Sequence, residues 1–91
     1  MRSIVQKEKE CWVCRRRDQL HYHHIFYGTA NRKLSEKYGM KVWLCYEHHT
    51  GPAGVHFNKG LDRRLKAYAQ EIFEQTYDIP FAEVFGKNYR G

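Results

Sequence analysis

The cysteines and histidines are the residues of this chain best suited to chemistry, and they lie close together in the sequence. There are three cysteines and six histidines, all between positions 11 and 56. A tetrahedral structural zinc needs four such ligands. The ligands beyond four are histidines, which suit both an open metal position and proton transfer near neutral pH. This surplus indicates an enzyme. The motifs are Cys11-x-x-Cys14, His21-Tyr22-His23-His24, Cys45-x-x-His48-His49 and His56.

Two ligand pairs predict a closed metal site made of Cys11, Cys14, Cys45 and His48. A two-residue gap lets one tight turn present both ligands to the same ion at about 2.0–2.3 Å. Two such pairs complete a tetrahedron and would tie the start of the chain to the end of a later strand. Free buried cysteines or a redox C-x-x-C motif are the alternatives. The spacing favours a structural zinc.

The remaining histidines predict a second, open site. Side chains alternate faces along a strand, so His23 and His24 should point in opposite directions. One of them can then bind a metal while the other faces a substrate. His49 directly follows a ligand of the closed site, which would fix its position. His23, His49 and His56 could then form a metal site with three nitrogen ligands and open positions. The alternatives are that His56 is a loop residue and that His21 packs or hydrogen-bonds on a strand face.

Length and composition indicate one small domain, residues 1–91. A chain this short buries little surface and often needs a metal to stay folded. An odd number of cysteines argues against a secreted disulfide framework. No apolar signal region or stretch of about 20 apolar residues is present in the sequence. We therefore expect a reducing, cytoplasmic location without membrane association.

The charge balance favours a polyanionic partner. Sixteen Lys and Arg against ten Asp and Glu give a formal charge of +6, and phosphate contacts dominate the affinity of basic domains for nucleic acid. Arg15, Arg16 and Arg17 directly follow the first ligand pair, and solubility alone explains such a run poorly. A flexible, solvated loop is the alternative. With Arg32 and Lys33, these arginines are the predicted phosphate contacts.

Hydrophobic periodicity predicts a mixed α+β domain. Residues 11–18 should form a metal knuckle, and residues 20–27 and 40–45 should form strands. The three- and four-residue spacing of apolar side chains after residue 61 predicts a helix to about residue 77, with a core-facing stripe. A short strand at 3–6, a brief helix at 32–38 and a last helical turn at 80–85 complete the expected order.

The runs Leu20-His21-Tyr22-His23-His24-Ile25 and Leu44-Cys45-Tyr46-Glu47-His48-His49, with Asn31 between them, resemble the HNH (ββα-metal) nucleases. The similarity is to the small, phage-type subclass with cysteine-flanked motifs. It covers roughly residues 11–58. It implies a treble-clef-like, zinc-stabilised ββα-metal fold, to which residues 59–86 add a C-terminal helical extension.

The resemblance also implies roles for individual residues. His23 and His49 correspond to ligands of a catalytic divalent ion (Mg²⁺, Mn²⁺, Ni²⁺ or Zn²⁺). His56 corresponds to the last ligand, with Asn58 as a second candidate. His24 corresponds to the general base that activates water, and Asn31 to the asparagine that orients the loop or the base.

The activity implied is hydrolysis of phosphodiester bonds in double-stranded DNA, inside a bacterial or phage-infected cell. Two other functions compete with it. A non-catalytic zinc module could bind nucleic acid through the basic surface, and a protein-interaction zinc domain could use the C-terminal helix for docking. Neither needs a His-His pair or a fifth metal ligand, so the histidine surplus favours the endonuclease. The sequence leaves the oligomeric state open.

Overall fold

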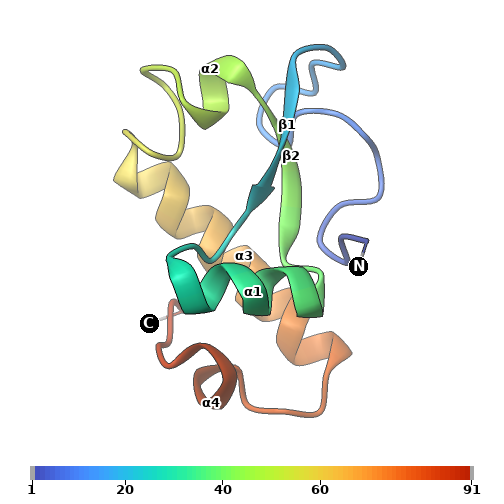
Figure 1. Cartoon of the computed structure of the whole chain (residues 1–91), viewed down its shortest axis with the longest axis vertical. Helices are drawn as coiled ribbons and strands as arrows, with labels where there is room; N and C mark the ends of the chain where they lie inside the picture. The colour runs from blue at the N-terminus through green and yellow to red at the C-terminus, as the bar shows by residue number, and fades with distance from the viewer. Residues whose placement is uncertain (1, 91) are drawn as a thin grey trace.

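Two antiparallel strands form the centre of the molecule (Figure 1), for which the computed structural model describes residues 2–90. β1 (Leu20–His24) pairs with β2 (Lys41–Cys45), so that Leu20 lies opposite Cys45 and His24 lies opposite Lys41. The first strand ends earlier than predicted, at residue 24. The hydroxyl of Ser35 accepts a hydrogen bond from the Phe26 amide and donates one to the Phe26 carbonyl, which ties the chain after β1 to a helix.

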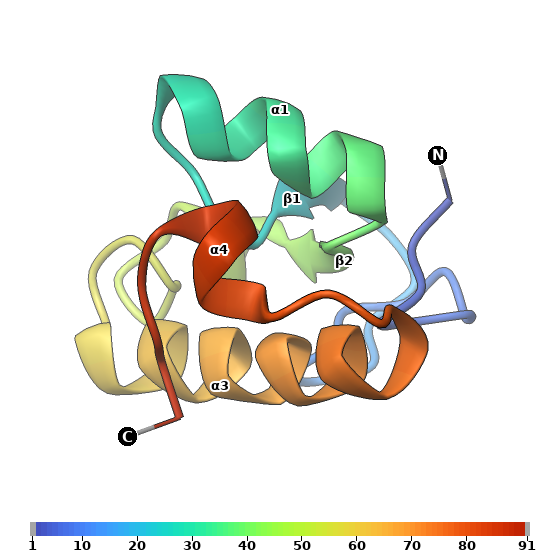
Figure 2. The ribbon, with the colours of Figure 1, turned by 90° about the horizontal axis from the view of Figure 1, so that it is seen from below.

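The helices cover both faces of this sheet. α1 (Thr29–Tyr38) and α3 (Lys59–Thr76) lie on opposite sides of the strands, and α4 (Phe81–Phe85) lies between them (Figure 2). α2 (Tyr46–His49) follows β2 directly. The helix predicted at 32–38 begins three residues earlier. The predicted long helix and last helical turn both form, with bounds shifted by one or two residues.

The N-terminal segment follows the outer edge of β2 but is not the strand expected at residues 3–6. Two side chains and one backbone amide, not a strand ladder, form hydrogen bonds with this edge. The Trp43 amide donates to the Gln6 side-chain oxygen at 2.8 Å, and the Ser3 hydroxyl donates to the Lys41 carbonyl. The Trp12 amide donates a hydrogen bond to the Trp43 carbonyl at 2.8 Å. These bonds place the cysteine knuckle beside the end of β2.

A single cluster of buried apolar residues joins the sheet to α3 and α4. Apolar residues of α3 recur every four positions and are fully buried, as the predicted stripe requires. Phe26 contacts two phenylalanine rings of α4, with ring centroids 4.7 and 5.0 Å apart. This packing fixes α3 so that its first turns lie near the end of β1. The principal members are Ile25, Phe26, Met40, Val42, Leu44, Leu65, Ala69, Phe73, Phe81 and Phe85.

Within residues 2–90, no helix is both long enough and apolar enough to cross a lipid bilayer.

Candidate functional site

The four residues of the predicted closed site converge on one point. The ligand atoms of Cys11, Cys14, Cys45 and His48 all lie within 4.8 Å of one another. The Sγ atoms of Cys14 and Cys45 are 3.8 Å apart, and His48 Nδ1 lies 3.2 Å from Cys45 Sγ and 3.8 Å from Cys11 Sγ. A tetrahedral ion would hold such atoms roughly 3.5–3.8 Å apart. The cluster therefore fits a structural metal.

Local backbone bonds prepare this cluster for a cation. The Cys11 amide donates to the Arg16 carbonyl and the Arg15 amide donates to the Cys11 carbonyl, each at 2.8 Å, which closes the knuckle. Burial raises the pKa of the Cys11 thiol, but backbone N–H groups of Cys45, Cys14 and Val13 outweigh burial and lower the pKa to about 7. The Cys11 thiolate is thus accessible near neutral pH. For Cys14, the Arg16 backbone N–H lowers the pKa, but burial and the neighbouring Cys11 and Cys45 outweigh it, so that the pKa is raised.

A second cluster contains His23, His49 and His56, whose ligand nitrogens also lie within 4.8 Å of one another. Their ring centroids are 5.0–5.5 Å apart. His23 is 3% exposed, and its Nε2 atom is buried without a hydrogen-bond partner among the described residues. Buried polar atoms are normally satisfied. Three converging imidazoles with such an unpaired nitrogen fit a divalent ion with open coordination positions.

The protonation of these rings is consistent with metal binding. Burial, followed by the neighbouring charges of His49 and His56, lowers the pKa of His23 to about 3. Burial and the nearby His56 and His21 also lower the pKa of His49. Both imidazoles are therefore neutral at pH 7, which is the form that coordinates metal.

Without an exchangeable metal ion, His23 should make the fold sensitive to mild acid. Its pKa falls from 6.5 to about 3 on folding, so the unfolded chain gains a proton that the folded chain excludes. The free energy of unfolding is unaffected by this group well above pH 6.5 and should fall progressively toward pH 3, with a slope approaching about 1.4 kcal/mol per pH unit. Denaturant melts of the wild type and His23→Gln at pH 7, 6 and 5 measure it. Equal slopes in the two proteins would contradict the expectation, because both retain the Cys/His cluster.

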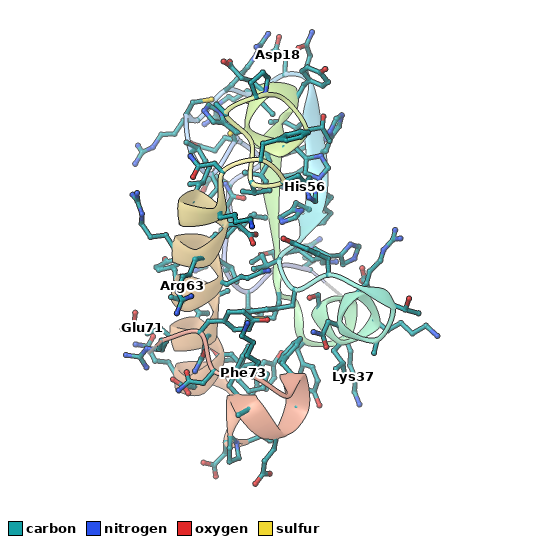
Figure 3. The ribbon with its side chains drawn as sticks, turned by 90° about the vertical axis from the view of Figure 1, so that its left-hand side faces the viewer. Asp18, Lys37, His56, Arg63, Glu71 and Phe73 are labelled. Carbon is teal, nitrogen blue, oxygen red and sulfur yellow. The ribbon has the colours of Figure 1, made fainter. Side chains whose placement is uncertain are left out.

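The loop between α2 and α3 brings His56 to the other two histidines, and Figure 3 labels His56 in this loop. The Val55 amide donates to the His48 carbonyl at 3.0 Å, and the Val55 side chain is buried. A Cβ on Gly54 would lie 2.6 Å from the His49 carbonyl oxygen, so this close approach requires glycine. The third candidate ligand thus comes from a loop. Asn58 has another role, because its side chain caps α3 by accepting from the Leu61 amide.

His21 lies at the rim of this cluster, on the same face of β1 as His23, because residues two apart in a strand point to the same side. Its Nδ1 atom is 3.0 Å from Nδ1 of His49. A histidine that binds metal through one nitrogen commonly hydrogen-bonds through the other. The contact with His21 therefore leaves His49 Nε2 for the cluster.

His24 points away from His23, as predicted, and meets a carboxylate. Its Nε2 atom lies 3.0 Å from Glu36 Oε1 on α1. The other oxygen of Glu36 accepts from the ammonium group of Lys41, also at 3.0 Å. Lys41 is buried and lies opposite His24 in the strand register. Since a carboxylate only accepts, Nε2 carries a proton, and in the neutral form of the ring Nδ1 keeps its lone pair.

One pocket joins His24 to the histidine cluster. It encloses about 270 Å³ at the end of β1, and it is lined by His24 with His23, His49, His56 and Arg32. β1 has no strand on its outer side within residues 2–90, so side chains from both faces reach this edge. The three clustered imidazoles, the His24 ring and a guanidinium therefore share one space.

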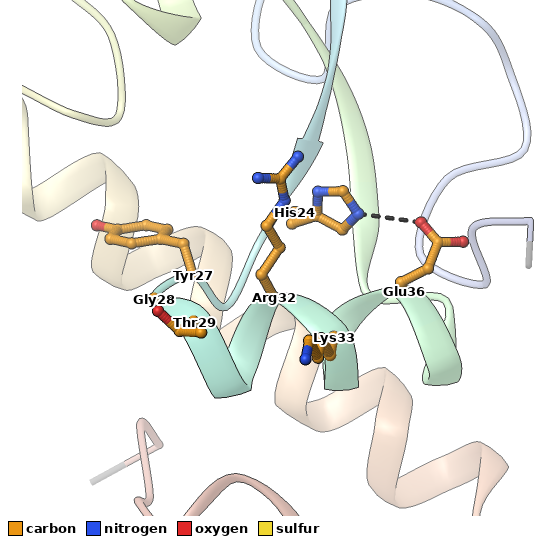
Figure 4. Close-up of a pocket in the computed structure, with 7 residues that line it drawn as sticks. All are labelled: His24, Tyr27, Gly28, Thr29, Arg32, Lys33 and Glu36. Carbon is orange, nitrogen blue, oxygen red and sulfur yellow. Dashed lines mark hydrogen bonds and ion pairs between the residues drawn. The ribbon is translucent and has the colours of Figure 1, made fainter.

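A wider groove of about 820 Å³ continues from this pocket along α1. Arg32 and Lys33 line it together with His24 and Glu36 (Figure 4). Arg32 lies on the side of the His24 ring opposite to Glu36. Both cationic side chains are exposed. The groove can accept an anionic chain that leads to His24.

The arginine run after the knuckle is arranged differently. Arg15 and Arg17 lie 3.9 and 3.4 Å from the Glu10 carboxylate, and Arg16 pairs with Asp18. None of the three lines the pocket or the groove. The carboxylates of Glu10 and Asp18 offset much of the positive charge of these arginines. The spacing of residues in the sequence did not indicate these contacts.

Asn31 is not brought to either space. It lies on α1, half-buried, and its side chain forms no hydrogen bond within residues 2–90. Neither the pocket nor the groove has Asn31 in its lining.

Comparisons of the chain with protein-family models, with curated proteins and with solved structures find no match. The residues and their geometry are therefore the basis for assigning a function.

Proposed function

We propose that this protein is a metal-dependent endonuclease of the HNH (ββα-metal) type, which hydrolyses phosphodiester bonds in DNA. One observation carries the proposal: His24 lines the same pocket as His23, His49, His56 and Arg32. A binding module would need neither a cluster of three imidazoles nor a histidine oriented by a carboxylate beside it.

The histidine cluster is the proposed site of the catalytic ion. A divalent ion bound there supplies Lewis-acid stabilisation of charge on the phosphate oxygens. His23 is held by burial, His49 by its contact with His21, and His56 by the glycine-containing loop. Their fixed positions leave room on the pocket side for water and a phosphate oxygen.

His24 is the proposed general base. The Glu36 carboxylate accepts from Nε2–H and thereby fixes the ring orientation. Nδ1 can then take a proton from the attacking water as its oxygen bonds to phosphorus and the sugar oxygen leaves. The imidazolium that forms lies beside a carboxylate, which stabilises it. Glu36 acts through His24 and is a positioning residue.

Arg32 and Lys33 are the proposed phosphate contacts. Both line the groove that leads to His24, and a guanidinium can bind two phosphate oxygens at once. We leave Arg15, Arg16 and Arg17 out of this role because carboxylates contact them. Asn31 likewise has no step in the mechanism.

The ion of the Cys/His cluster is proposed to be zinc. Three thiolates and one imidazole are ligands that zinc prefers in closed, tetrahedral sites. The knuckle, the two strands and the helix that follows then form a treble-clef-like frame, in which the zinc holds Cys11 and Cys14 against the end of β2. Its role is structural.

Cleavage of supercoiled plasmid tests the activity. The zinc-loaded protein, freed of exchangeable ions by mild chelation, should be inactive. Addition of Mg²⁺, Mn²⁺ or Ni²⁺ should restore nicking, and gel electrophoresis measures it. A gel shift without cleavage under every metal would contradict the proposal and favour a zinc module that only binds nucleic acid.

A further inference from the structure

A third pocket, of about 310 Å³, opens between the start of α3 and the C-terminal segment. Four cationic side chains line it: Lys59, Arg63, Lys66 and Lys87. The proposed function assigns nothing to it.

The charge of this pocket is strongly unbalanced. Among the described residues, Asp62 is the one carboxylate in its lining. Lys66 contacts Asp62 Oδ2 at 3.0 Å, and the Tyr27 hydroxyl donates to the same oxygen at 2.9 Å. Lys59, Arg63 and Lys87 are exposed and form no ion pair within residues 2–90. Three positive charges are therefore left facing one cavity.

Helix energetics alone would not favour this arrangement. Lys59 and Arg63 are four residues apart on α3, where like charges repel. Lys59 also lies in the first turn of the helix, where a cation is unfavourable. Lys87 is brought to them because Gln70 accepts from the Tyr89 amide at 2.7 Å and donates to Asn88 at 2.8 Å. Figure 3 shows Arg63 on the side of the molecule away from α1.

Tyr27 connects this pocket to the reaction site. It lines the cationic pocket, the histidine pocket and the groove along α1. Lys66 lies over its ring, 4.1 Å from the centroid. The histidine pocket is thus flanked by cationic surfaces from two different helices, which suits a chain with charges at regular intervals.

We propose that Lys59, Arg63 and Lys87 bind a backbone phosphate of the nucleic acid whose scissile bond lies in the histidine pocket. This inference rests on the proposed function for the identity of the ligand. It extends the substrate path from α1 across Tyr27 to α3. The ligand chemistry is a phosphodiester chain.

Fluorescence anisotropy with a labelled DNA duplex, a single strand and an RNA of the same sequence tests it, without added divalent cations. The triple variant Lys59→Ala/Arg63→Ala/Lys87→Ala should bind its preferred strand type at least about tenfold more weakly near 0.1 M salt. The slope of log K against log[salt] should become shallower by about 2–3. The control removes three exposed lysines elsewhere, Lys7, Lys9 and Lys37. Equal affinity and slope in the two triple variants would overturn the proposal.

Plasmid cleavage by the wild type separates the two proposals. A wild type that binds through this pocket but never cleaves would refute hydrolysis and leave the phosphate site standing. A wild type that cleaves, with a triple variant that binds like the control, would refute the phosphate site alone. Absence of binding to all three probes would refute both. Lys87→Ala alone, outside the helices, should show a smaller loss in the same direction and guards against a folding artefact.

Discussion

Cys14→Ser should abolish cooperative folding. Cys14 is exposed, and exposed substitutions usually change stability by no more than about 0.5 kcal/mol. Its sulfur, however, lies 3.8 Å from Cys45 Sγ in a cluster that ties the knuckle to β2. A structural zinc contributes on the order of 10 kcal/mol of apparent binding energy, which is comparable to the whole stability of a small domain. The expected product is a molten or unfolded chain.

Thermal melts followed by circular dichroism, together with metal analysis, measure this effect. The adjacent variant Val13→Ser is the control, because Val13 is similarly exposed and contributes no ligand. It should retain a cooperative melt and its bound zinc. A native-like, cooperative melt of Cys14→Ser would show that the cluster does not hold the fold together.

His24→Ala should lower the rate of DNA cleavage by about 10²–10⁴-fold or more, because general-base assistance usually contributes that much. The His24 side chain is half-buried and lies outside the hydrophobic cluster. Its loss should therefore leave the fold and the affinity for DNA intact. Single-turnover cleavage of a labelled duplex measures the rate, and anisotropy without added divalent cations measures the affinity.

Glu36→Gln provides a graded comparison for this role. The amide oxygen can still accept from His24 Nε2–H, but it lacks the charge that stabilises the imidazolium. The cleavage rate should fall by less than in His24→Ala, and Glu36→Ala should lie between the two. Unchanged cleavage by His24→Ala would remove His24 from the mechanism, whatever Glu36 does.

The sequence predicted the elements whose periodicity comes from burial. The near-continuous apolar run before Cys45 is a buried strand, and the spacing after Leu61 is a helix with an apolar face. Local physics also separated His23 from His24, because adjacent strand residues face opposite ways. The C-x-x-C and C-x-x-H pairs predicted the Cys/His cluster from the sequence alone, because a two-residue gap lets one turn present both ligands to the same ion.

Features that depend on contacts between elements were not predicted. Glu36 reaches His24 only because α1 begins at Thr29 and crosses the end of the sheet where β1 ends and β2 begins. The carboxylate of Glu10 meets the arginine run because the N-terminal segment follows β2. Lys87 joins α3 through the side chain of Gln70. None of these contacts leaves a periodic or short-range signal, so sequence spacing could not reveal them.

The short helix α2 links the two clusters. α2 is four residues long and carries His48 of the Cys/His cluster next to His49 of the histidine cluster. Removing the proposed zinc from the thiolates should thus also displace the neighbouring imidazoles, even when other divalent ions are abundant. Progressive chelation should first strip the exchangeable ion reversibly, and then cause a collapse in which both centres disappear together.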